Sequence, residues 1–467
     1  MRNEDKFNRD IQNITEKKKK KNRMPDQDKL VPSFRPKLVA DYRHQSSTST
    51  RVDESSLSRG DPGQREPSVI SISSGSEESG DVEVVSATSH SSATSRGSGS
   101  RSSGGQFRSS DRPSSTRAGS GAGAGLGFSV LSYNILADVL QRRHPELYTS
   151  CRAEDLDWAA RWAAIKAQIA GLGWPDVVCL QEVQVRRPDH AATQILPFLA
   201  SHGYTVVVKP KTGDKDDGCL TAFRKDKFEL EEECPVEYKV DRVPVLDRDN
   251  VGLILKLAPK MGGATPRPLL VANTHLLYNP KRGDIRLCQA AMLLAELDRL
   301  GPGRDTPVIL AGDLNSQPDS PVVQLLTAGQ LSYSGQKLGR RARRPAPHKL
   351  LPDSLGLSDS CQWLVALQQR GEADSGLATN TGGFWHGLEL ASAFPADRVT
   401  THQDGWTMVD YILYSASPRA KLRLASTQQL PCAQDMRQEG SFHSERIPNQ
   451  KCPSDHLPLL ANFRLLP

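Results

Sequence analysis

The sequence predicts an α/β fold for residues 128–467, a four-layer α/β sandwich in which two packed β-sheets are flanked by helices. Within this part, short apolar runs bounded by Gly, Pro or charged residues alternate with segments of helical spacing. Several of the runs follow one another with no helix between them, which favours two packed sheets over one parallel sheet. Residues 1–127 are instead rich in Ser, Gly, Arg and Lys, so we expect a disordered tail ahead of the fold.

The individual elements can be assigned in order along the chain. Runs rich in Val, Ile, Leu and aromatic residues predict strands at residues 128–134, 176–182, 204–209, 219–224, 252–257, 269–275, 307–313, 409–414 and 458–463. Two sets of apolar residues recur at helical spacing and predict helices: Trp158, Trp162, Ile165 and Ile169, then Leu287, Ala291, Leu294 and Leu297. Residues 335–400 contain Gly, Pro and a basic cluster that consists of Arg340, Arg341, Arg343 and Arg344. We expect this stretch to be a solvated insertion, with contact to a phosphate backbone as the alternative.

Charge and cysteine usage limit the functional classes. Most of the net formal charge of +6 comes from residues 1–127, so only a local basic surface on the folded part would indicate nucleic-acid binding. The eight cysteines all lie in residues 128–467 without a C-x-x-C pair, which is typical of reduced thiols in a cytosolic or nuclear protein. The first residues lack an apolar signal segment, and no apolar run is long enough to span a bilayer. We therefore predict localisation in the nucleus and cytoplasm, and no membrane partner.

Two segments of the predicted tail have patterns that suggest a use. The lysine run at residues 17–21 is either a nuclear-import signal or a solvated block of charge. In residues 69–85, the aliphatic stretch Val69-Ile70-Ser71-Ile72 precedes acidic and phosphorylatable residues. This order resembles a SUMO-interacting motif, which adds a strand to an exposed sheet edge while its acidic flank meets lysines. The alternative is a plain linker.

Polar residues end the predicted strands or lie beside them. They include Asn134, Glu182, His275, Asp313, Asp410, Asp455 and His456. Carboxylate, amide and imidazole groups delivered to one end of a sheet are what a metal-dependent phosphoesterase needs. Glu182 offers hard oxygen ligands to Mg²⁺, with Mn²⁺ as the alternative metal, and Asn134 and Asp455 can support it. A salt bridge at the sheet end is the structural alternative for Glu182.

The other residues of this series suit proton transfer and charge stabilisation. Asp313 can hold the attacking water as a general base, and Asn315, two residues on, can orient that water or a phosphate oxygen. An Asx-turn that closes the strand is the alternative for this pair. His456 can neutralise charge on the phosphate if Asp410 fixes its tautomer. We expect His456 at an exposed sheet end, whereas His275 either contacts a phosphate oxygen or caps its strand.

Longer motifs around these residues resemble a known superfamily. The motifs are Leu131-Ser132-Tyr133-Asn134-Ile135-Leu136-Ala137, Cys179-Leu180-Gln181-Glu182-Val183-Gln184, Leu246-Asp247-Arg248-Asp249-Asn250-Val251-Gly252-Leu253, Ala272-Asn273-Thr274-His275-Leu276-Leu277-Tyr278-Asn279-Pro280-Lys281-Arg282-Gly283-Asp284 and Ser454-Asp455-His456-Leu457-Pro458-Leu459-Leu460. They resemble the exonuclease-endonuclease-phosphatase superfamily, and within it the Angel homologues, relatives of the mRNA deadenylases and of nocturnin. The resemblance implies two packed sheets flanked by helices and Mg²⁺-dependent cleavage of phosphoesters.

The resemblance implies the same metal, nucleophile and imidazole roles as the residue chemistry does, and it adds His275 and Asn250 as substrate contacts. Angel homologues are associated with removal of 2′,3′-cyclic phosphates from RNA ends, so this hydrolysis is the expected reaction and RNA the expected partner. The deadenylases also have leucine-rich repeats, which residues 1–127 lack, and an aromatic residue that stacks on a base. The stretch Gly405-Trp406-Thr407-Met408 stands in its place, which makes Trp406 the candidate for base stacking.

Two other functions are compatible with the sequence. A 3′-to-5′ exoribonuclease of the deadenylase type would shorten a single-stranded RNA instead of changing only its end group. An inactive RNA-binding or SUMO-recruited adaptor is the third hypothesis. The complete set of metal, base and imidazole residues argues against the adaptor, because a decayed site would be expected to have lost at least one of them.

Overall fold

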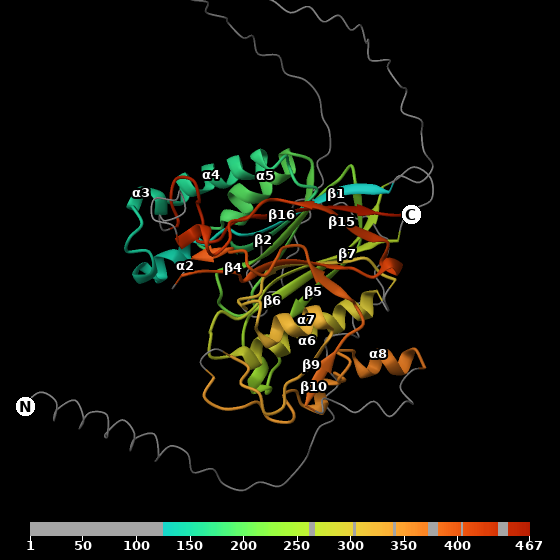
Figure 1. Ribbon diagram of the computed structural model, residues 1–467. Helices are drawn as coiled ribbons and strands as arrows, with labels where there is room; N and C mark the ends of the chain where they lie inside the picture. The colour runs from blue at the N-terminus through green and yellow to red at the C-terminus, as the bar shows by residue number, and fades with distance from the viewer. Residues whose placement is uncertain are drawn as a thin grey trace, which may run out of the picture. The chain divides into compact units, whose positions relative to one another are not determined.

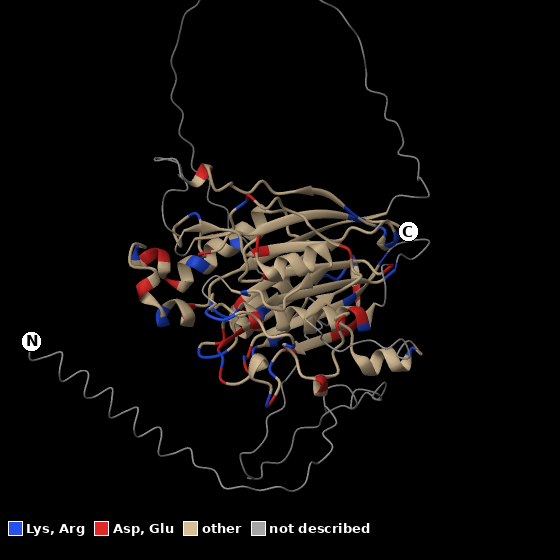
Figure 2. Cartoon of the chain, turned by 60° about the horizontal axis from the view of Figure 1, so that its bottom comes forward, with Lys and Arg blue, Asp and Glu red and all other residues tan. Residues whose placement is uncertain are grey.

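The structure is a computed structural model that describes residues 125–260, 267–301, 305–339, 342–371, 382–402, 405–437 and 447–467. The tail segments at residues 17–21 and 69–85 lie outside these ranges, as do Arg340 and Arg341, so the assignments made for them stay predictions. None of the helices within the described ranges has the length and hydropathy to cross a bilayer. Acidic and basic residues are interspersed along the ribbon of the fold, as the near balance of charge in this part predicts (Figure 2).

Strands β1 and β2 run parallel to each other in the middle of the first sheet, and the other pairs in this sheet are antiparallel. In spatial order its strands are β15 (Leu422–Thr427), β16 (Leu459–Leu465), β1 (Leu126–Asn134), β2 (Val177–Gln184), β4 (Asp217–Arg224) and β3 (Tyr204–Pro210). Because β1 and β2 are parallel, their carboxyl ends lie side by side at the same end of the sheet.

The second sheet repeats this plan with β7 and β8 as its parallel pair. In spatial order its strands are β11 (Leu390–Ser392), β14 (Asp410–Ser415), β8 (Val308–Asp313), β7 (Leu269–His275), β6 (Val251–Pro259) and β5 (Phe228–Glu237). Strand β14 runs antiparallel to β8, and Asp410, the first residue of β14, pairs with Asp313, the last residue of β8. Three side chains therefore reach one edge of this sheet: His275, Asp313 and Asp410.

Helices cover the outer faces of both sheets, which confirms the predicted four-layer sandwich (Figure 1). Helices α4 (Trp158–Gly171) and α5 (Leu196–Ser201) lie over the first sheet, and α6 (Gly283–Leu300) and α7 (Pro321–Ala328) lie over the second. Side chains alternate along the central strands. Val130 and Val177 join the cluster that includes the second sheet, whereas Leu131 and Leu180 pack with the residues of α4 and α5.

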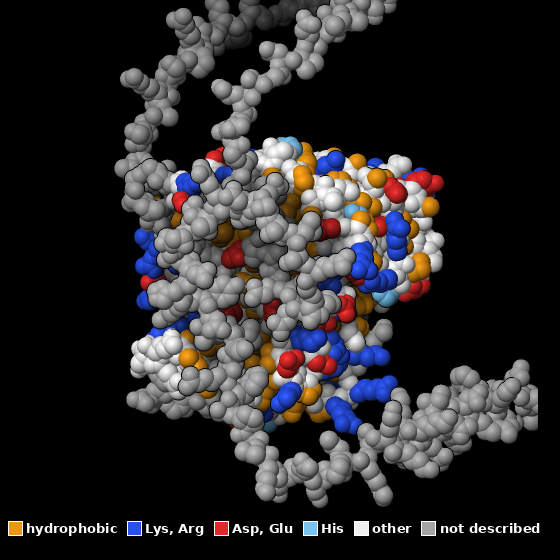
Figure 3. Space-filling model, turned by 180° about the vertical axis from the view of Figure 1, so that it is seen from behind, with side chains coloured by type: hydrophobic (Ala, Val, Ile, Leu, Met, Phe, Trp, Pro, Cys, Tyr) orange, Lys and Arg blue, Asp and Glu red, His pale blue; other side chains and the backbone are white. Residues whose placement is uncertain are grey.

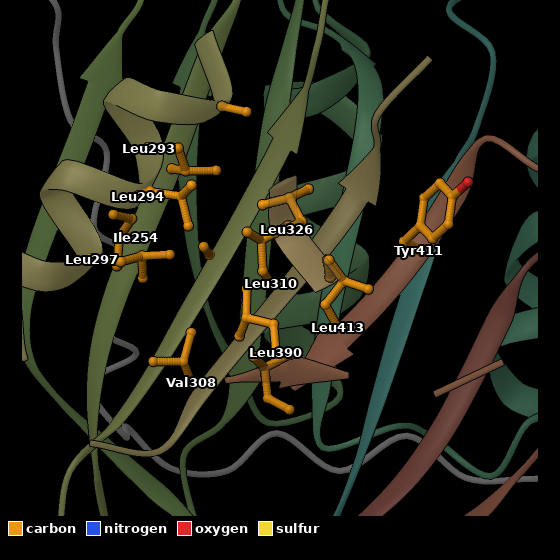
Figure 4. Close-up of a cluster of buried hydrophobic side chains, with 14 of the residues drawn as sticks. Ile254, Leu293, Leu294, Leu297, Val308, Leu310, Leu326, Leu390, Tyr411 and Leu413 are labelled. Carbon is orange, nitrogen blue, oxygen red and sulfur yellow. The ribbon is translucent and has the colours of Figure 1, made fainter. Parts of the chain in front are cut away.

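The largest buried cluster joins the second sheet to α6. Figure 4 shows Leu293, Leu294 and Leu297 of α6 facing strands of this sheet, among them β8 with Val308 and Leu310. All five side chains are almost completely buried. A core of this extent holds β7 and β8 in place, and with them the side chains at their carboxyl ends.

Every predicted strand is present, and its ends differ from the prediction by at most two residues. The sequence pattern missed β5 and β15, which are edge strands with many exposed positions and therefore have no continuous apolar run. The prediction of a solvated insertion at residues 335–400 was too simple, because α8 (Leu364–Gln369), β10 (Gly383–Trp385) and β11 form within it.

Short elements complete the described part of the chain. They are α2 (Asp138–Arg143), α3 (Ala153–Leu156), the pair β9 (Gln330–Ser332) with β10, and the pair β12 (Thr401–His402) with β13 (Trp406–Thr407). Single helical turns of 3-10 or π geometry lie at Pro145–Leu147, Ala191–Ile195, Pro244–Leu246, Asp353–Leu355, Pro418–Ala420 and Asp435–Arg437.

Candidate active site

The two parallel strand pairs end against each other, and the side chain of Asn134 connects them. Its Nδ2 donates to Oε1 of Glu182 at 3.1 Å and to Oδ2 of Asp313 at 3.1 Å. Its Oδ1 accepts from the backbone N–H of Leu136 at 3.0 Å. Asn134 was predicted to support the metal, and it links a carboxylate of each sheet in this arrangement, with its amide oxygen turned toward the backbone.

Glu182 owes its position to an irregularity in β2. The register between β2 and β4 shifts between Leu180 and Val183, and Glu182 has a φ of 54°, which few residues other than glycine adopt. The bulge directs the carboxylate toward β1, where Oε2 also accepts from the backbone N–H of Ala137 at 3.2 Å. Burial and the nearby carboxylate of Asp455 raise the pKa of Glu182.

Asp313 is buried at the end of β8. Burial and the Asp410 carboxylate raise its pKa to about 7, although the nearby His456 and the hydrogen bonds from Asn315 and Asn134 oppose this shift. The backbone N–H of Asn315 donates to Oδ1 of Asp313 at 2.8 Å, which is the Asx-turn considered as the structural alternative. A carboxylate that titrates near neutral pH is well suited to accept a proton from water.

The residues on both sides of Asp313 differ from the simple extended chain that the sequence suggested. Asn315 has a left-handed φ of 48°, and its Nδ2 donates to the carbonyl of Leu276 at 2.9 Å. Gly312 was expected to allow close approach of a ligand. A Cβ at this glycine would instead lie 2.0 Å from the carbonyl oxygen of Thr274, so the glycine permits close approach of β7.

His456 and Asp410 form the predicted pair. Nδ1 of His456 lies 2.9 Å from Oδ2 of Asp410, and its Nε2 lies 3.8 Å from Oδ2 of Asp313. Burial alone would lower the pKa of His456, but Asp410, followed by Asp313 and Asp455, raises it well above the usual value. The nearby carboxylates therefore favour the protonated form of this buried imidazole, and its second nitrogen faces the candidate base. It lies at a sheet end as predicted, but it is 3% exposed and not at an exposed position.

His275 has the opposite electrostatic character. Its Nε2 lies 3.6 Å from Oδ2 of Asp313, and burial, with the positive charges of Lys211 and His456, lowers its pKa well below the usual value. The imidazole is therefore neutral. Asn250, expected as a substrate contact, lies behind it: Nδ2 donates to the carbonyl of His275 at 3.0 Å, and Oδ1 accepts from Nε2 of Gln289 at 3.3 Å. In this structure Asn250 positions the backbone of His275.

The segment before β16 is attached to the end of β1 by contacts that the sequence did not reveal. The Ser454 hydroxyl donates to the carbonyl of Asn134 at 2.7 Å. Asp455, the predicted metal supporter, accepts a hydrogen bond from the Tyr148 hydroxyl at 2.9 Å. The buried Arg161 of α4 uses one Nη atom to donate to the carbonyls of Ile135 and Pro453, at 3.1 and 3.2 Å. Arg161 had only its place on a predicted helix to distinguish it.

A buried ion pair next to Glu182 and His275 was also missed. Nζ of Lys211 lies 2.6 Å from Oδ2 of Asp217, and both side chains are nearly inaccessible. Burial would lower the pKa of Lys211, but Asp217 and then Glu182 raise it. Lys211 follows β3 and Asp217 begins β4, so pairing of the two strands brings them together. The sequence signal that could have found this pair is its position between two apolar runs, which predicts a hairpin that brings the two residues together.

The hairpin of β12 and β13 places Trp406 beside this segment. Thr401 of β12 pairs with His456, and the backbone N–H of His402 donates to the carbonyl of Asp455 at 3.2 Å. The partly buried Trp406 meets His402 edge-on, with ring centroids 4.9 Å apart. The hairpin is thus attached to the same segment that contains His456. Base stacking on Trp406 stays a prediction.

Glu182 fits a divalent cation better than the cluster of Asp313, Asp410 and His456 does. Asp313, Asp410 and His456 offer ligand atoms within 4.8 Å of one another, but Nδ1 of His456 is already hydrogen-bonded to Asp410, so these two groups are engaged with each other. The recorded donors to the Glu182 carboxylate are the Asn134 amide and the Ala137 N–H, and the carboxylate of Asp455 raises its pKa. A bound cation would relieve this repulsion with oxygen ligands, which Mg²⁺ prefers.

The fold and this arrangement of carboxylates and imidazoles are those of a phosphoesterase. Comparison of the chain with known proteins gives the same class. The sequence profile of the Endonuclease/Exonuclease/phosphatase family matches residues 130–456, which extend from β1 to His456. The chain therefore belongs to this family, and it is a hydrolase of the class that cleaves phosphoesters.

Within the family, the chain is similar to the angel homologues, as the motifs suggested. Protein angel homolog 2 of Bos taurus is 38% identical over 380 residues, which cover 72% of this chain and 69% of that protein. Protein angel homolog 1 of Homo sapiens is 32% identical over 442 residues, which cover 76% and 65%. The crystal structure of ANGEL2, described as a 2′,3′-cyclic phosphatase in complex with adenosine-2′,3′-vanadate, superposes with a TM-score of 0.63 at 37% identity and covers 73% of this chain and 96% of that one.

Proposed function

We propose that this protein is a metal-dependent phosphoesterase that hydrolyses 2′,3′-cyclic phosphates at the 3′ ends of RNA. The single observation that carries the proposal is the position of His456, a buried cation held between Asp410 and the candidate base Asp313. The likeness to a protein described as a 2′,3′-cyclic phosphatase supplies the substrate class. The same arrangement would serve an exoribonuclease, so the likeness to that protein is what favours the cyclic phosphate, and the adaptor hypothesis has no observation of this kind in its favour.

The proposed reaction needs one proton acceptor and one positive charge near the phosphorus atom. The Asp313 carboxylate takes a proton from water while the water oxygen forms a bond to phosphorus, and the bond from phosphorus to one ribose oxygen breaks. The released ribose oxygen takes up a proton from water. The imidazolium of His456 stabilises the negative charge that grows on the phosphate oxygens, and Asp410 keeps its Nδ1 occupied so that Nε2 faces the substrate.

Glu182 would hold the cation, with Asp455 as the second carboxylate on that side and Asn134 fixing Glu182 in place. We propose Mg²⁺, with Mn²⁺ as the alternative, because the donors are hard oxygen atoms. A bound divalent cation supplies charge neutralisation for the phosphate and for the leaving oxygen. Neutral His275 is placed to donate a hydrogen bond to a phosphate oxygen from the other side of Asp313.

The test compares oligonucleotides that differ only at the 3′ end. The purified protein is incubated with Mg²⁺ and single strands that end in a 2′,3′-cyclic phosphate, a 3′-phosphate or a hydroxyl, and the products are resolved by length and by end group. We expect loss of the cyclic phosphate without shortening of the strand. Stepwise shortening of the hydroxyl-terminated strand would favour the exoribonuclease. No change in any strand would favour the adaptor.

The proposals for the rest of the chain depend on residues outside the described ranges. We propose that residues 69–85 bind SUMO and that the protein is found in the nucleus and cytoplasm. Replacing Val69, Ile70 and Ile72 by Ala should remove SUMO binding by a labelled peptide of this segment, since these side chains would fill the pockets of the added strand. A native peptide that binds no more tightly than the substituted one would leave the segment a plain linker.

A further inference from the structure

Two loops that adjoin Asn250 and His275 in the sequence, and a third loop that touches one of them, have a surplus of unpaired basic side chains. Arg242, Lys281, Lys337, Arg343 and Arg344 are exposed, and within the described part of the chain none is recorded in an ion pair. Most other charges of these loops are paired, as in Lys239 with Asp249, Arg248 with Asp247, Arg282 with Asp284 and Lys349 with Asp353. We call the five unpaired residues the basic rim.

The backbone holds these loops against one another. A Cβ built at Gly283 would lie 1.4 Å from the carbonyl oxygen of Leu338, so the loop before α6 and the loop after β9 touch backbone to backbone. The second of these loops is closed by the backbone N–H of Ala346, which donates to the carbonyl of Gln336 at 2.7 Å. Figure 3 shows Lys and Arg side chains gathered at the lower right of the face seen from behind.

The same surface contains an apolar recess between two cations. A shallow depression that is open to solvent, of about 380 Å³, is lined by two segments, Arg242, Val243, Pro244 and Val245, and Lys349, Leu350, Leu351 and Pro352. Apart from the two basic side chains its walls are aliphatic or proline. A flat apolar group on a negatively charged chain suits such a recess, and an unpaired nucleobase on an RNA strand has both properties.

Two residues of the rim follow or precede site residues closely in the sequence. Arg242 precedes Asn250 by eight residues and Lys281 follows His275 by six, so neither can lie farther than about 30 Å from the residue it is connected to. Asn250 and His275 are themselves hydrogen-bonded. The 53% exposed side chain of Tyr278 lies in the sequence between His275 and Lys281 and offers a ring to the same surface.

We propose that the basic rim binds the phosphates of a single-stranded RNA whose 3′ end lies in the candidate active site, and that the recess takes one base of that strand. This inference rests on the proposed function for the position of the 3′ end. It explains how a folded part with nearly balanced charge holds a polyanion, since basic side chains without a recorded ion-pair partner outnumber acidic ones in these loops. Entry of a base into the recess requires an unpaired strand.

The test replaces three arginines of the rim, as Arg242→Glu, Arg343→Glu and Arg344→Glu in one variant. The matched control reverses three exposed arginines elsewhere, as Arg419→Glu, Arg423→Glu and Arg464→Glu. The latter positions belong to the turn before β15, to β15 and to the far end of β16, whereas His456 precedes the near end of β16. Melting temperatures are measured for both variants to verify that each one folds.

Two measurements are made on the full chain. The first is the affinity for a hydroxyl-terminated single strand of about 12 nucleotides, a length within the usual range of binding sites for single strands. We expect the rim variant to lose at least about tenfold in affinity and to lower the slope of log affinity against log salt by about 2, as the loss of three phosphate contacts requires. The control variant should match the parent protein.

The second measurement is the ratio of kcat/KM between a long strand and a dinucleotide, both ending in a 2′,3′-cyclic phosphate. The rim variant should lower this ratio by about the same tenfold factor, because the dinucleotide is too short to reach the rim. Equal ratios for the rim variant, the control and the parent would overturn the inference. So would equal loss of affinity for a duplex of the same length, since a paired strand cannot place a base in the recess. A parent protein that turns over neither substrate would instead overturn the proposed function.

Discussion

The two sheets have nearly the same architecture but contribute different chemistry to the site. Each has six strands, a parallel pair in its interior and helices on its outer face. The first sheet supplies Glu182 and Asn134, the residues suited to a cation. The second supplies Asp313 and Asp410, the candidate base and the partner of the imidazole. Each sheet alone would therefore lack either the candidate metal ligands or the candidate base.

Two of the contacts that join the halves involve candidate site residues on both sides. Nδ2 of Asn134, on the first sheet, donates to Asp313 on the second. His456, in the segment before β16 of the first sheet, meets Asp410 at the start of β14. The comparison teaches that similar sheets diverge in function through the polar residues at their carboxyl ends, while the apolar alternation that packs them is shared. Substitutions in either half should therefore abolish chemistry in different ways.

The largest effect is expected on the side of the first sheet. Glu182→Gln keeps the size of the side chain but removes the charge that a divalent cation needs, so turnover should fall by at least ~10³-fold, as loss of several kcal/mol of transition-state stabilisation implies. Turnover is measured over a titration of Mg²⁺, with Glu232→Gln on the exposed part of β5 as the control. Turnover within about tenfold of the parent throughout the titration, with half-saturation at the same Mg²⁺ concentration, would show that Glu182 is not the metal ligand.

The next effect concerns the contact that joins the sheets. His456→Ala and Asp410→Ala should each lower kcat by ~10² to 10³-fold, and the double variant should be little worse than either one, because the carboxylate acts through the imidazole. Single-turnover rates of the three variants form the cycle that checks this. Fully multiplicative losses would assign Asp410 a task of its own on the second sheet.

The pH dependence of kcat/KM should report on Asp313 of the second sheet. Because Asp313 must be ionised to accept a proton and its pKa is raised to about 7, kcat/KM should fall about tenfold per pH unit below this value. The same raised pKa makes the folded metal-free protein bind a proton more tightly than the unfolded chain does. The contribution of Asp313 to the free energy of unfolding should therefore decrease as pH rises from about 4 to about 7.

Asp313→Asn provides the matching measurement of stability. It abolishes the base but removes a buried charge, so the melting temperature relative to that of the parent should be higher at about pH 8 than at about pH 4. Asp241→Asn on an exposed loop is the control. A difference in melting temperature that does not change with pH would contradict the raised pKa of Asp313.

The smallest effect is expected for Arg161 of α4, whose hydrogen bonds reach only the segments next to strands of the first sheet. Arg161→Met keeps most of the buried volume but releases the carbonyls of Ile135 and Pro453, so the segment with His456 should lose its alignment with Asn134. We expect kcat to fall by roughly tenfold with little change in KM, since a misplaced group costs chemistry more than binding. Arg423→Met is the exposed control. A change confined to KM would place Arg161 at the substrate.

The sequence predicted the interior of the fold better than its edges, for a physical reason. Central strands such as β7 are buried on both faces and appear as continuous apolar runs, so their positions were found to within two residues. Edge strands such as β5 bury only some of their residues, and its glutamates concealed it. In the same way Glu182, Asp313 and His456 were found because each lies at the end of an apolar run or just before one, whereas Arg161 and Tyr148 had no such position.

The sequence by itself determined the sandwich fold, the family and the kinds of group that the site contains, because alternating apolar runs and local motifs are properties of neighbouring residues. Only the tertiary structure decided how these groups act on one another. The charge of His456, the neutrality of His275 and the raised pKa of Asp313 depend on burial and on partners more than 40 residues away, as the contact of Asn134 with Asp313 does. Electrostatic interactions act through space, so the packing of the two sheets had to be known before they could be assigned.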